Sequence, residues 1–253
     1  MKVLITGSSG LIGSVLNRLL SDTFEFSGLD LHRPDKANIP TLITDGADLD
    51  AMMPAFRGID AVIHLAASAA INTGWPDILK NNISMTHNVY EAARQQGAKR
   101  IVFASSNHVV GNFEMDEPYA RIKDGDYEGL TPDGFERVDH TVPIRPDSDY
   151  GVSKAFGEGV GRYYHEHFGL EVACLRIGTV NRKNSPAGST RSFATWLSYR
   201  DLAQLVKQCL TQPLGFEIFY GVSDNTWRFW DTDYAKKNIG YSPLDNAEDY
   251  RTA

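Results

Sequence analysis

The sequence predicts an α/β protein whose core is a doubly wound parallel β-sheet. Short apolar runs alternate with segments of helical spacing over most of the chain. The runs at residues 3–5, 61–65 and 101–104 are almost entirely apolar, which is typical of strands covered on both faces. Right-handed crossovers between such parallel strands place helices on both sides of the sheet.

The expected elements alternate between strand and helix along the chain. Strands are predicted at residues 3–5, 24–29, 41–44, 61–65, 101–104, 172–177 and 217–220. Helices are predicted at residues 11–20, 48–56, 76–96, 150–168 and 200–210. Asp48 suits the N-cap of the second helix, and Pro76 suits the first turn of the third. Residues 112–147 are rich in Asp, Glu, Gly and Pro and are expected to form a long loop.

The bulk composition limits the kinds of partner. The 253 residues are 42% hydrophobic, enough for one large core, and the net charge of −7 argues against nucleic acid or an anionic membrane as partner. Cys174 and Cys209 have no metal-ligand spacing, so buried free thiols and no bound metal are expected. The opening MKVLITG enters a strand directly, without a signal peptide, and we therefore expect a cytoplasmic protein.

Glycines are spaced G-x-x-G-x-x-G between the first strand and the first helix. Gly7 permits a tight turn, Gly10 a close approach of the backbone to a pyrophosphate, and Gly13 close packing of the helix on the sheet. Leu11 and Ile12 open the helix, where free N–H groups are suited to a phosphate. The loop therefore predicts a dinucleotide-binding, Rossmann-type fold; the alternative is a glycine-rich turn without a ligand.

The residue that ends the second strand indicates which dinucleotide is bound. Asp30 is placed to accept hydrogen bonds from the adenosine ribose hydroxyls, and its charge would repel the 2′-phosphate of NADP. NAD is therefore the expected cofactor, although Arg33 nearby would soften the discrimination. The alternative is a solvated aspartate that begins a turn.

Two dipeptides after later strands are also expected beside the cofactor. Asp48 and Leu49 are predicted to touch the adenine, although a plain helix cap explains Asp48 equally well. Ala66 and Ala67 close the fourth strand with side chains small enough for a cofactor to pass.

The chain shows no internal repeat, low-complexity tract or clear linker. We therefore expect a single Rossmann-type domain over residues 1–253. About residues 1–178 would form the dinucleotide-binding core, and about residues 179–253 would form mostly a small lobe on the substrate side, since they are too few for a large second domain.

A tyrosine and a lysine stand four residues apart at the start of the helix predicted at residues 150–168. The spacing of Tyr150 and Lys154 puts both side chains on one helix face. A neighbouring ammonium favours the phenolate, so Tyr150 is suited to take a proton from a substrate hydroxyl while Lys154 lowers its pKa and holds the nicotinamide ribose. Taken alone, the pattern is common by chance, and a surface pair would be the better interpretation.

Together, the glycine loop, a serine-bearing strand end and Tyr-x-x-x-Lys resemble the extended short-chain dehydrogenase/reductase superfamily over nearly the whole chain. The resemblance implies that Ser106, five residues before Gly111, is the catalytic serine in preference to Ser105. It also implies that Asn82 and Ile177 lie beside the cofactor, and that the protein is a homo-oligomer.

Four shorter motifs are similar to the uronate dehydrogenases, which oxidise C1 of a hexuronic acid to an aldarolactone with NAD: SSNH at 105–108, RIGT at 176–179, SFATWLS at 192–198 and DNAE at 245–248. This resemblance implies that Asn107 and His108 bind substrate hydroxyls and that Thr179 lies near the substrate. Arg191 matches the arginine that holds the sugar carboxylate, a group that a guanidinium can bind bidentately.

Three alternatives to a uronate dehydrogenase remain open. The archaeal NAD-dependent glucose-6-phosphate dehydrogenases share many of these motifs, and Arg182, Lys183 and Arg191 would then clamp a phosphate; another aldose is also compatible. A sugar-nucleotide epimerase or dehydratase uses the same serine, tyrosine and lysine but needs a larger C-terminal region. A dinucleotide-sensing regulator commonly lacks the tyrosine or the lysine, and both are present here. The acidic segment at residues 112–147, which includes Glu114, would repel an anionic sugar if it folded over the site.

Overall fold

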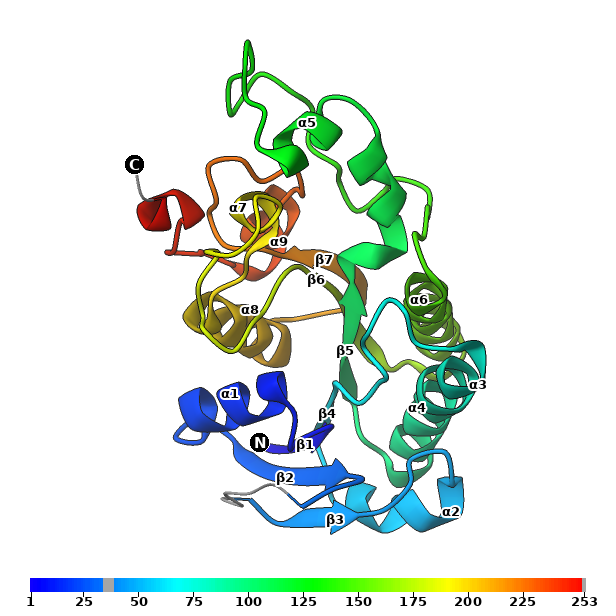
Figure 1. Cartoon of the computed structure of the whole chain (residues 1–253). Coiled ribbons are helices and arrows are strands. Elements are labelled where there is room, and N and C mark those ends of the chain that lie inside the picture. The colour runs from blue at the N-terminus through cyan, green and yellow to red at the C-terminus, as the bar shows by residue number, and fades with distance from the viewer. Residues whose placement is uncertain (34–38, 252–253) are drawn as a thin grey trace.

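A seven-stranded parallel sheet forms the centre of the computed structural model, which describes residues 1–33 and 39–251 (Figure 1). The strand order is β3-β2-β1-β4-β5-β6-β7. The strands are β1 (Lys2–Thr6), β2 (Glu25–Asp30), β3 (Thr41–Ile43), β4 (Ala61–His64), β5 (Arg100–Ser106), β6 (Glu171–Ile177) and β7 (Phe216–Gly221). The order reverses between β1 and β4, which in such sheets opens a crevice at the carboxyl ends of the strands. The predicted doubly wound fold is confirmed.

Alternate residues of each strand face opposite layers of helices. Val3 and Ile5 pack with α1 (Leu11–Leu20) and α8 (Tyr199–Thr211), whereas Leu4 between them packs on the other side. That second side is covered by α4 (Met85–Gln96) and α6 (Asp149–Phe168), with α2 (Leu49–Met52) and the 3₁₀ turn η1 (Met53–Phe56) at its edge (Figure 1). Both faces of the sheet are therefore apolar, as the continuous hydrophobic strands predict.

The long helix predicted at residues 76–96 is interrupted. It begins as α3 (Trp75–Ile78), widens into the π-helical turn η2 (Leu79–Ser84) and continues as α4. Asn82 lies in this turn, buried, and its side chain bonds both the backbone N–H and the carbonyl of Ser68. Side-chain hydrogen bonds of this kind stabilise the π-helical turn, where the backbone leaves the regular hydrogen-bond pattern of an α-helix. The helical spacing of apolar residues in the sequence does not reveal such a turn.

The segment at residues 112–147 is more ordered than a loop. The 3₁₀ helix η3 (Asn107–Met115) enters it and α5 (Tyr119–Asp124) follows. Its sparse apolar residues, including Ile122 and Val138, pack with Trp230 in a third hydrophobic cluster. The expectation of a loop was wrong for residues 112–124, where a few buried side chains that the acidic composition conceals accompany helical turns, whereas residues 125–147 contain no helix or strand.

The chain after residue 178 contributes both to the central sheet with its helical cover and to several shorter elements. α8 and β7 complete the central sheet and its helical cover. The short helix α9 (Asp233–Ile239) packs with α8 on the sheet, next to β7. The shorter elements α7 (Ser192–Thr195) and η4 (Ala247–Tyr250) lie beyond the sheet, and α5 lies on the same side of it (Figure 1). In the part of the chain that the structure describes, no helix has the length and apolar character needed to cross a membrane.

Candidate active site

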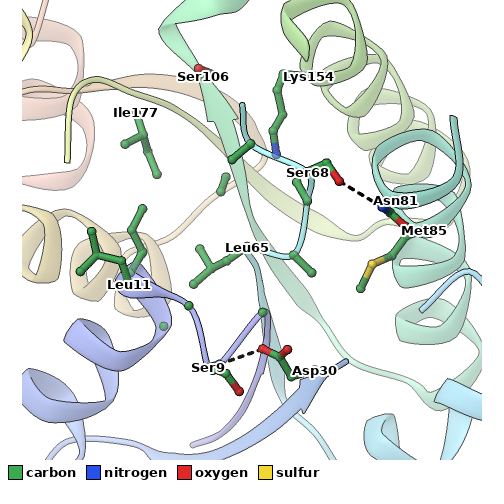
Figure 2. A pocket seen from close by; sticks show the side chains of 18 of the residues that line it. Ser9, Leu11, Asp30, Leu65, Ser68, Asn81, Met85, Ser106, Lys154 and Ile177 are labelled. Carbon is green, nitrogen blue, oxygen red and sulfur yellow. Dashed lines mark hydrogen bonds between the residues drawn. The ribbon is translucent and has the colours of Figure 1, made fainter. Parts of the chain in front are cut away.

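A cavity of about 780 Å³ opens at the carboxyl ends of the strands and collects most of the predicted site residues (Figure 2). Such a volume falls in the range of cofactor and small-ligand sites. The predicted residues that line it are Gly7, Gly10, Leu11, Ile12, Gly13, Asp30, Ala66, Ala67, Ser106, Asn107, His108, Tyr150, Lys154, Ile177, Thr179 and Arg191. The strand ends bring them together because parallel strands finish at the same edge.

The glycine loop is shaped for close approach of a phosphate group. Gly7 has φ +72°, and a Cβ there would lie 2.8 Å from the backbone nitrogen of Ala66. At Gly13 a Cβ would lie 2.7 Å from the carbonyl oxygen of Gly7. Gly10 caps α1 without any side-chain hydrogen bond, so the helix N–H groups are left for a ligand. These residues fit a dinucleotide pyrophosphate.

Asp30 is held against the cavity wall by backbone groups. Its Oδ2 accepts a hydrogen bond from the N–H of Ser9 at 2.8 Å (Figure 2), and its Oδ1 accepts one from the N–H of His32 at 3.1 Å. Arg33 lines the same part of the cavity. The carboxylate therefore has a fixed orientation at the end of β2, where an adenosine ribose is expected.

Asp48 and Leu49 are not among the residues that line the cavity. Asp48 caps α2, with its Oδ1 accepting the N–H of Ala51 at 3.0 Å, so the plain-cap alternative describes it. Asp45 and Gly46, two and three residues after β3, line the cavity instead. Asp45, like Asp30 at the end of β2, is an acidic residue close to the carboxyl end of a parallel strand, and that was the signal available in the sequence.

Asn82 is also not among the residues that line the cavity. Its Nδ2 donates to the hydroxyl of Ser153 at 2.9 Å as well as to the carbonyl of Ser68, and thereby joins α6 to the loop after β4. The neighbouring Asn81 does line the cavity and donates to the hydroxyl of Ser68 at 3.0 Å (Figure 2). Asn82 therefore supports the cavity wall, a role that follows from its burial.

The two serines at the end of β5 have different hydrogen bonds. Ser105 donates to Glu158 Oε1 at 2.6 Å, and Glu158 forms a buried ion pair with Arg176 at 2.9 Å. The hydroxyl of Ser106 accepts the N–H of His108 at 3.2 Å and donates only a long hydrogen bond, of 3.4 Å, to Asn107 Oδ1. β5 extends through both serines, two residues beyond its apolar run, because their backbone pairs with Arg176 and Ile177 of β6.

We expect Ser106→Ala and Ser105→Ala to fail in different ways. If Ser106 is the catalytic serine that the family resemblance implies, its loss removes a donor to the reacting oxygen, so kcat should fall roughly 100-fold with little change in melting temperature. Loss of Ser105 removes a hydrogen bond to the buried Glu158 carboxylate, which should cost about 1–2 kcal/mol of stability with kcat within a few-fold of wild type. Steady-state kinetics and urea unfolding of both variants measure the two effects; a larger kcat loss in Ser105→Ala would reverse the assignment.

Tyr150 and Lys154 meet in the first turn of α6. Ser148 caps this helix by accepting the N–H of Gly151 at 3.1 Å. Burial raises the pKa of Tyr150 to about 12, a rise that a hydrogen bond with Ser106 partly offsets. Burial lowers the pKa of Lys154 to about 7.

The protein by itself does not lower the pKa of Tyr150, contrary to the sequence-based expectation for Lys154. The lysine Nζ lies 5.5 Å from the centre of the Tyr150 ring and 5.0 Å from that of Phe103. Burial has the largest effect on the pKa of both groups, because neither the phenolate nor the ammonium ion is well solvated there. The phenolate therefore needs a further positive charge beside it.

His108 is oriented by an aspartate that the sequence patterns did not single out. Its Nδ1 lies 2.7 Å from Asp147 Oδ2. Burial is the largest single influence and raises the pKa of Asp147, but the hydrogen bond and electrostatic attraction of His108, together with the hydrogen bond from Ser148, leave this pKa below its ordinary value. A Cβ at Gly111 would collide with that carboxylate, and one at Gly151 would collide with the carbonyl of His108. Both glycines thus make room for the imidazole and its partner.

Arg191 lines the cavity but is already paired. Its Nε and Nη2 donate to Glu114 at 2.5 and 2.6 Å, and its Nη1 donates to Thr179 Oγ1 at 3.3 Å. Arg182 and Lys183 are exposed and are not among the lining residues. Of the three cations proposed for a phosphate clamp, the described structure therefore brings Arg191 alone into the cavity.

This fold and site define a class of protein that comparison with known families identifies. The NAD dependent epimerase/dehydratase family model matches residues 3–210, and the chain belongs to that family. The resemblance to the extended short-chain dehydrogenases, drawn from the glycine loop and Tyr-x-x-x-Lys, is confirmed.

Within the family, the chain is similar to several sugar dehydrogenases. A uronate dehydrogenase of Pseudomonas putida is 36% identical over 100% of this chain and 87% of that protein. An NAD-dependent glucose-6-phosphate dehydrogenase of Haloferax volcanii is 35% identical over 98% of this chain and 95% of that protein. Among solved structures, a mutant of uronate dehydrogenase from Agrobacterium tumefaciens, complexed with NAD, superposes with a TM-score of 0.83 at 35% identity, covering 99% of this chain and 87% of that one.

Proposed function

We propose that this protein is an NAD-dependent dehydrogenase that oxidises the anomeric C1 of an aldohexuronic acid, such as glucuronate or galacturonate, to the aldarolactone. The observation that carries the proposal is the convergence of Ser106, Tyr150 and Lys154 on one cavity with the glycine loop and Arg191. The likeness to uronate dehydrogenases over essentially the whole chain supports the same substrate class.

Ser106, Tyr150 and Lys154 have different roles in the proposed oxidation. Ser106 donates a hydrogen bond to the C1 oxygen, and Tyr150 takes the proton of the C1 hydroxyl as the carbon–oxygen double bond forms. NAD, when bound, supplies the hydride acceptor for the hydrogen on C1 and a positive charge near the phenol. Lys154 adds a hydrogen-bonding group for the ribose hydroxyls and, when it is protonated, a second positive charge. Positive charge beside the phenol favours the Tyr150 phenolate against its burial.

NAD is the cofactor that the cavity residues fit. The Asp30 carboxylate stands where the adenosine ribose is expected, and a 2′-phosphate there would meet a negative charge. Asn107, His108 and Thr179 line the same cavity and offer hydrogen bonds to sugar hydroxyls. The end edge of the Arg191 guanidinium is available for the sugar carboxylate.

NADH formation by purified protein tests this function directly. Glucuronate, galacturonate, glucose-6-phosphate and glucose are compared in parallel, each with NAD and with NADP. We expect turnover of a uronate with NAD. Turnover of the phosphosugar alone would contradict the substrate class but keep the mechanism, and tightly bound NAD without any turnover would favour an epimerase or dehydratase.

A second candidate is an NAD-dependent glucose-6-phosphate dehydrogenase. The observation that favours it is the coverage of the Haloferax volcanii relative, 95% of which aligns with this chain. The lining of the cavity argues against this second function, since Arg191 would have to hold a phosphate dianion without help from Arg182 or Lys183.

Three broader properties belong to the same proposal. The chain would act as one domain, with about residues 1–178 serving mainly the dinucleotide and about residues 179–253 mainly the sugar. The two buried free cysteines support a reducing, cytoplasmic location. Exposed apolar side chains on α6, including Val152, Phe156 and Tyr163, support a homo-oligomer.

A further inference from the structure

Glu114 is a buried carboxylate in direct contact with the cation expected to recognise the substrate. Only 6% of Glu114 is exposed, and its two oxygens lie 2.5 and 2.6 Å from Nε and Nη2 of Arg191. This is the bidentate geometry in which a guanidinium binds a carboxylate most specifically. The protein thus supplies to Arg191 the same kind of group that a uronate carries.

The pair leaves Arg191 with a defined free edge and little net charge. Glu114 occupies the Nε–Nη2 edge, which leaves Nη1, whose hydrogen bond to Thr179 is 3.3 Å long, with a further N–H to donate. The hydroxyl of Thr179 bonds that of Thr195 at 2.8 Å, and Thr195 in turn donates to the Arg191 carbonyl, so this edge is held in place. A ligand here meets an ordered donor edge whose positive charge is already balanced.

We propose that Glu114 is a specificity-determining residue that sets the charge of the sugar subsite. It lowers the affinity of the subsite for anions in proportion to their charge, so that a neutral aldose or a uronate monoanion is accepted and a phosphate dianion is rejected. This inference rests on the proposed function and deepens it, because it distinguishes the uronate from the phosphosugar.

The position of Glu114 explains why it can do this without blocking the site. It lies on η3, the 3₁₀ helix that begins directly after Ser106, and Asn107 Nδ2 approaches its Oε1 at 3.5 Å. The carboxylate therefore stands behind Arg191 and beside Asn107, two of the proposed sugar-binding residues. Charges a few ångströms apart in a partly buried site interact strongly, whereas exposed acids of the same segment are screened by water.

A series of four hexoses tests the proposal at pH 8: glucose (neutral), glucuronate and glucose-6-sulfate (monoanions), and glucose-6-phosphate (a dianion at this pH). kcat/KM is measured for wild type, Glu114→Gln and the double variant Glu114→Gln/Arg191→Met. The control Glu128→Gln makes the same change at an exposed acid of the same segment. Dividing kcat/KM for each anionic sugar by kcat/KM for glucose separates the effect of charge from any general effect of the substitution on the geometry of the site.

In Glu114→Gln we expect kcat/KM relative to glucose to rise roughly five- to tenfold for each negative charge on the sugar. Glu128→Gln should leave all four values unchanged, and the double variant should lose the gain. Equal effects of Glu114→Gln on all four sugars, or a loss confined to the anions, would overturn the proposal in favour of a purely structural role.

Wild-type protein gives a second measurement, which holds even if Glu114→Gln does not fold. Glucose-6-sulfate and glucose-6-phosphate have nearly the same shape, so their difference reports charge. We expect the sulfate to be bound at least several-fold more tightly, as substrate or as competitive inhibitor, and tighter binding of the phosphate would overturn the proposal. Since this comparison does not use glucuronate, its outcome is separate from that of the proposed function.

Discussion

Tyr150→Phe is expected to lower kcat by about 1000-fold, the scale of a lost general base. The phenol lines the cavity beside Ser106, and in the proposed mechanism its oxygen takes the proton from the sugar. The ring is retained, so the packing of α6 and the affinity for NAD should stay close to wild type. Single-turnover NADH formation measures the chemical step, and calorimetric titration with NAD measures binding.

The matched control for this variant is Tyr163→Phe, which removes the same hydroxyl from an exposed position on the same helix. It should leave both kcat and NAD affinity unchanged. A Tyr150→Phe enzyme with wild-type rates would refute the mechanism, and one that had lost NAD binding would assign Tyr150 to the cofactor instead.

Lys154→Met is expected to abolish useful activity and at the same time to stabilise the protein. Lys154 is fully buried, and burial lowers its pKa from 10.5 to about 7. A shift of that size corresponds to at most about 5 kcal/mol of unfavourable free energy when the lysine is charged, and we expect about 2–4 kcal/mol to be recovered by methionine. Urea unfolding without cofactor measures the gain, and NADH formation measures the loss.

The stabilisation should depend on pH in a defined direction. Between about pH 7 and pH 10.5 the unfolded lysine is protonated and the folded one is not, so the unfolded state binds more protons. The stability of wild type relative to Lys154→Met therefore rises with pH through this window, and the advantage of the variant is greatest below about pH 7.

The control for the lysine is Lys183→Met, an exposed position that should show neither effect. A stability difference for Lys154→Met that stays constant from pH 6 to pH 10 would show that burial does not shift the titration of Lys154.

The sequence predicts the sheet and the cofactor loop well because both depend on local patterns. A run such as Ile101–Ala104 has to be buried on both faces, and only a strand inside a parallel sheet provides that. Gly7 and Gly13 are required by backbone approaches of less than 3 Å, so their spacing carries the geometry with it. The same holds for Tyr150 and Lys154, which one helical turn places on the same face.

Other residues carry no local pattern that reveals their partners. Asp147 and Glu158 are separated from His108 and Ser105 by 39 and 53 positions, yet each fixes the orientation of its partner. Asn82 fits the sequence pattern of a cofactor contact, but its burial assigns it to the support of Ser68. Such pairings depend on the packing of distant segments and not on periodicity.

The sequence by itself therefore determined the fold class, the dinucleotide loop and the shared helix face of Tyr150 and Lys154, because short-range spacing and continuous hydrophobicity specify them; the choice of Ser106 came from the family resemblance. Only the tertiary structure decided that Arg191 is paired with Glu114, 77 residues away, and that Arg182 and Lys183 stay outside the cavity lining. The physical reason is that the effective charge of a side chain in a partly buried site depends on the neighbours that folding brings within a few ångströms of it.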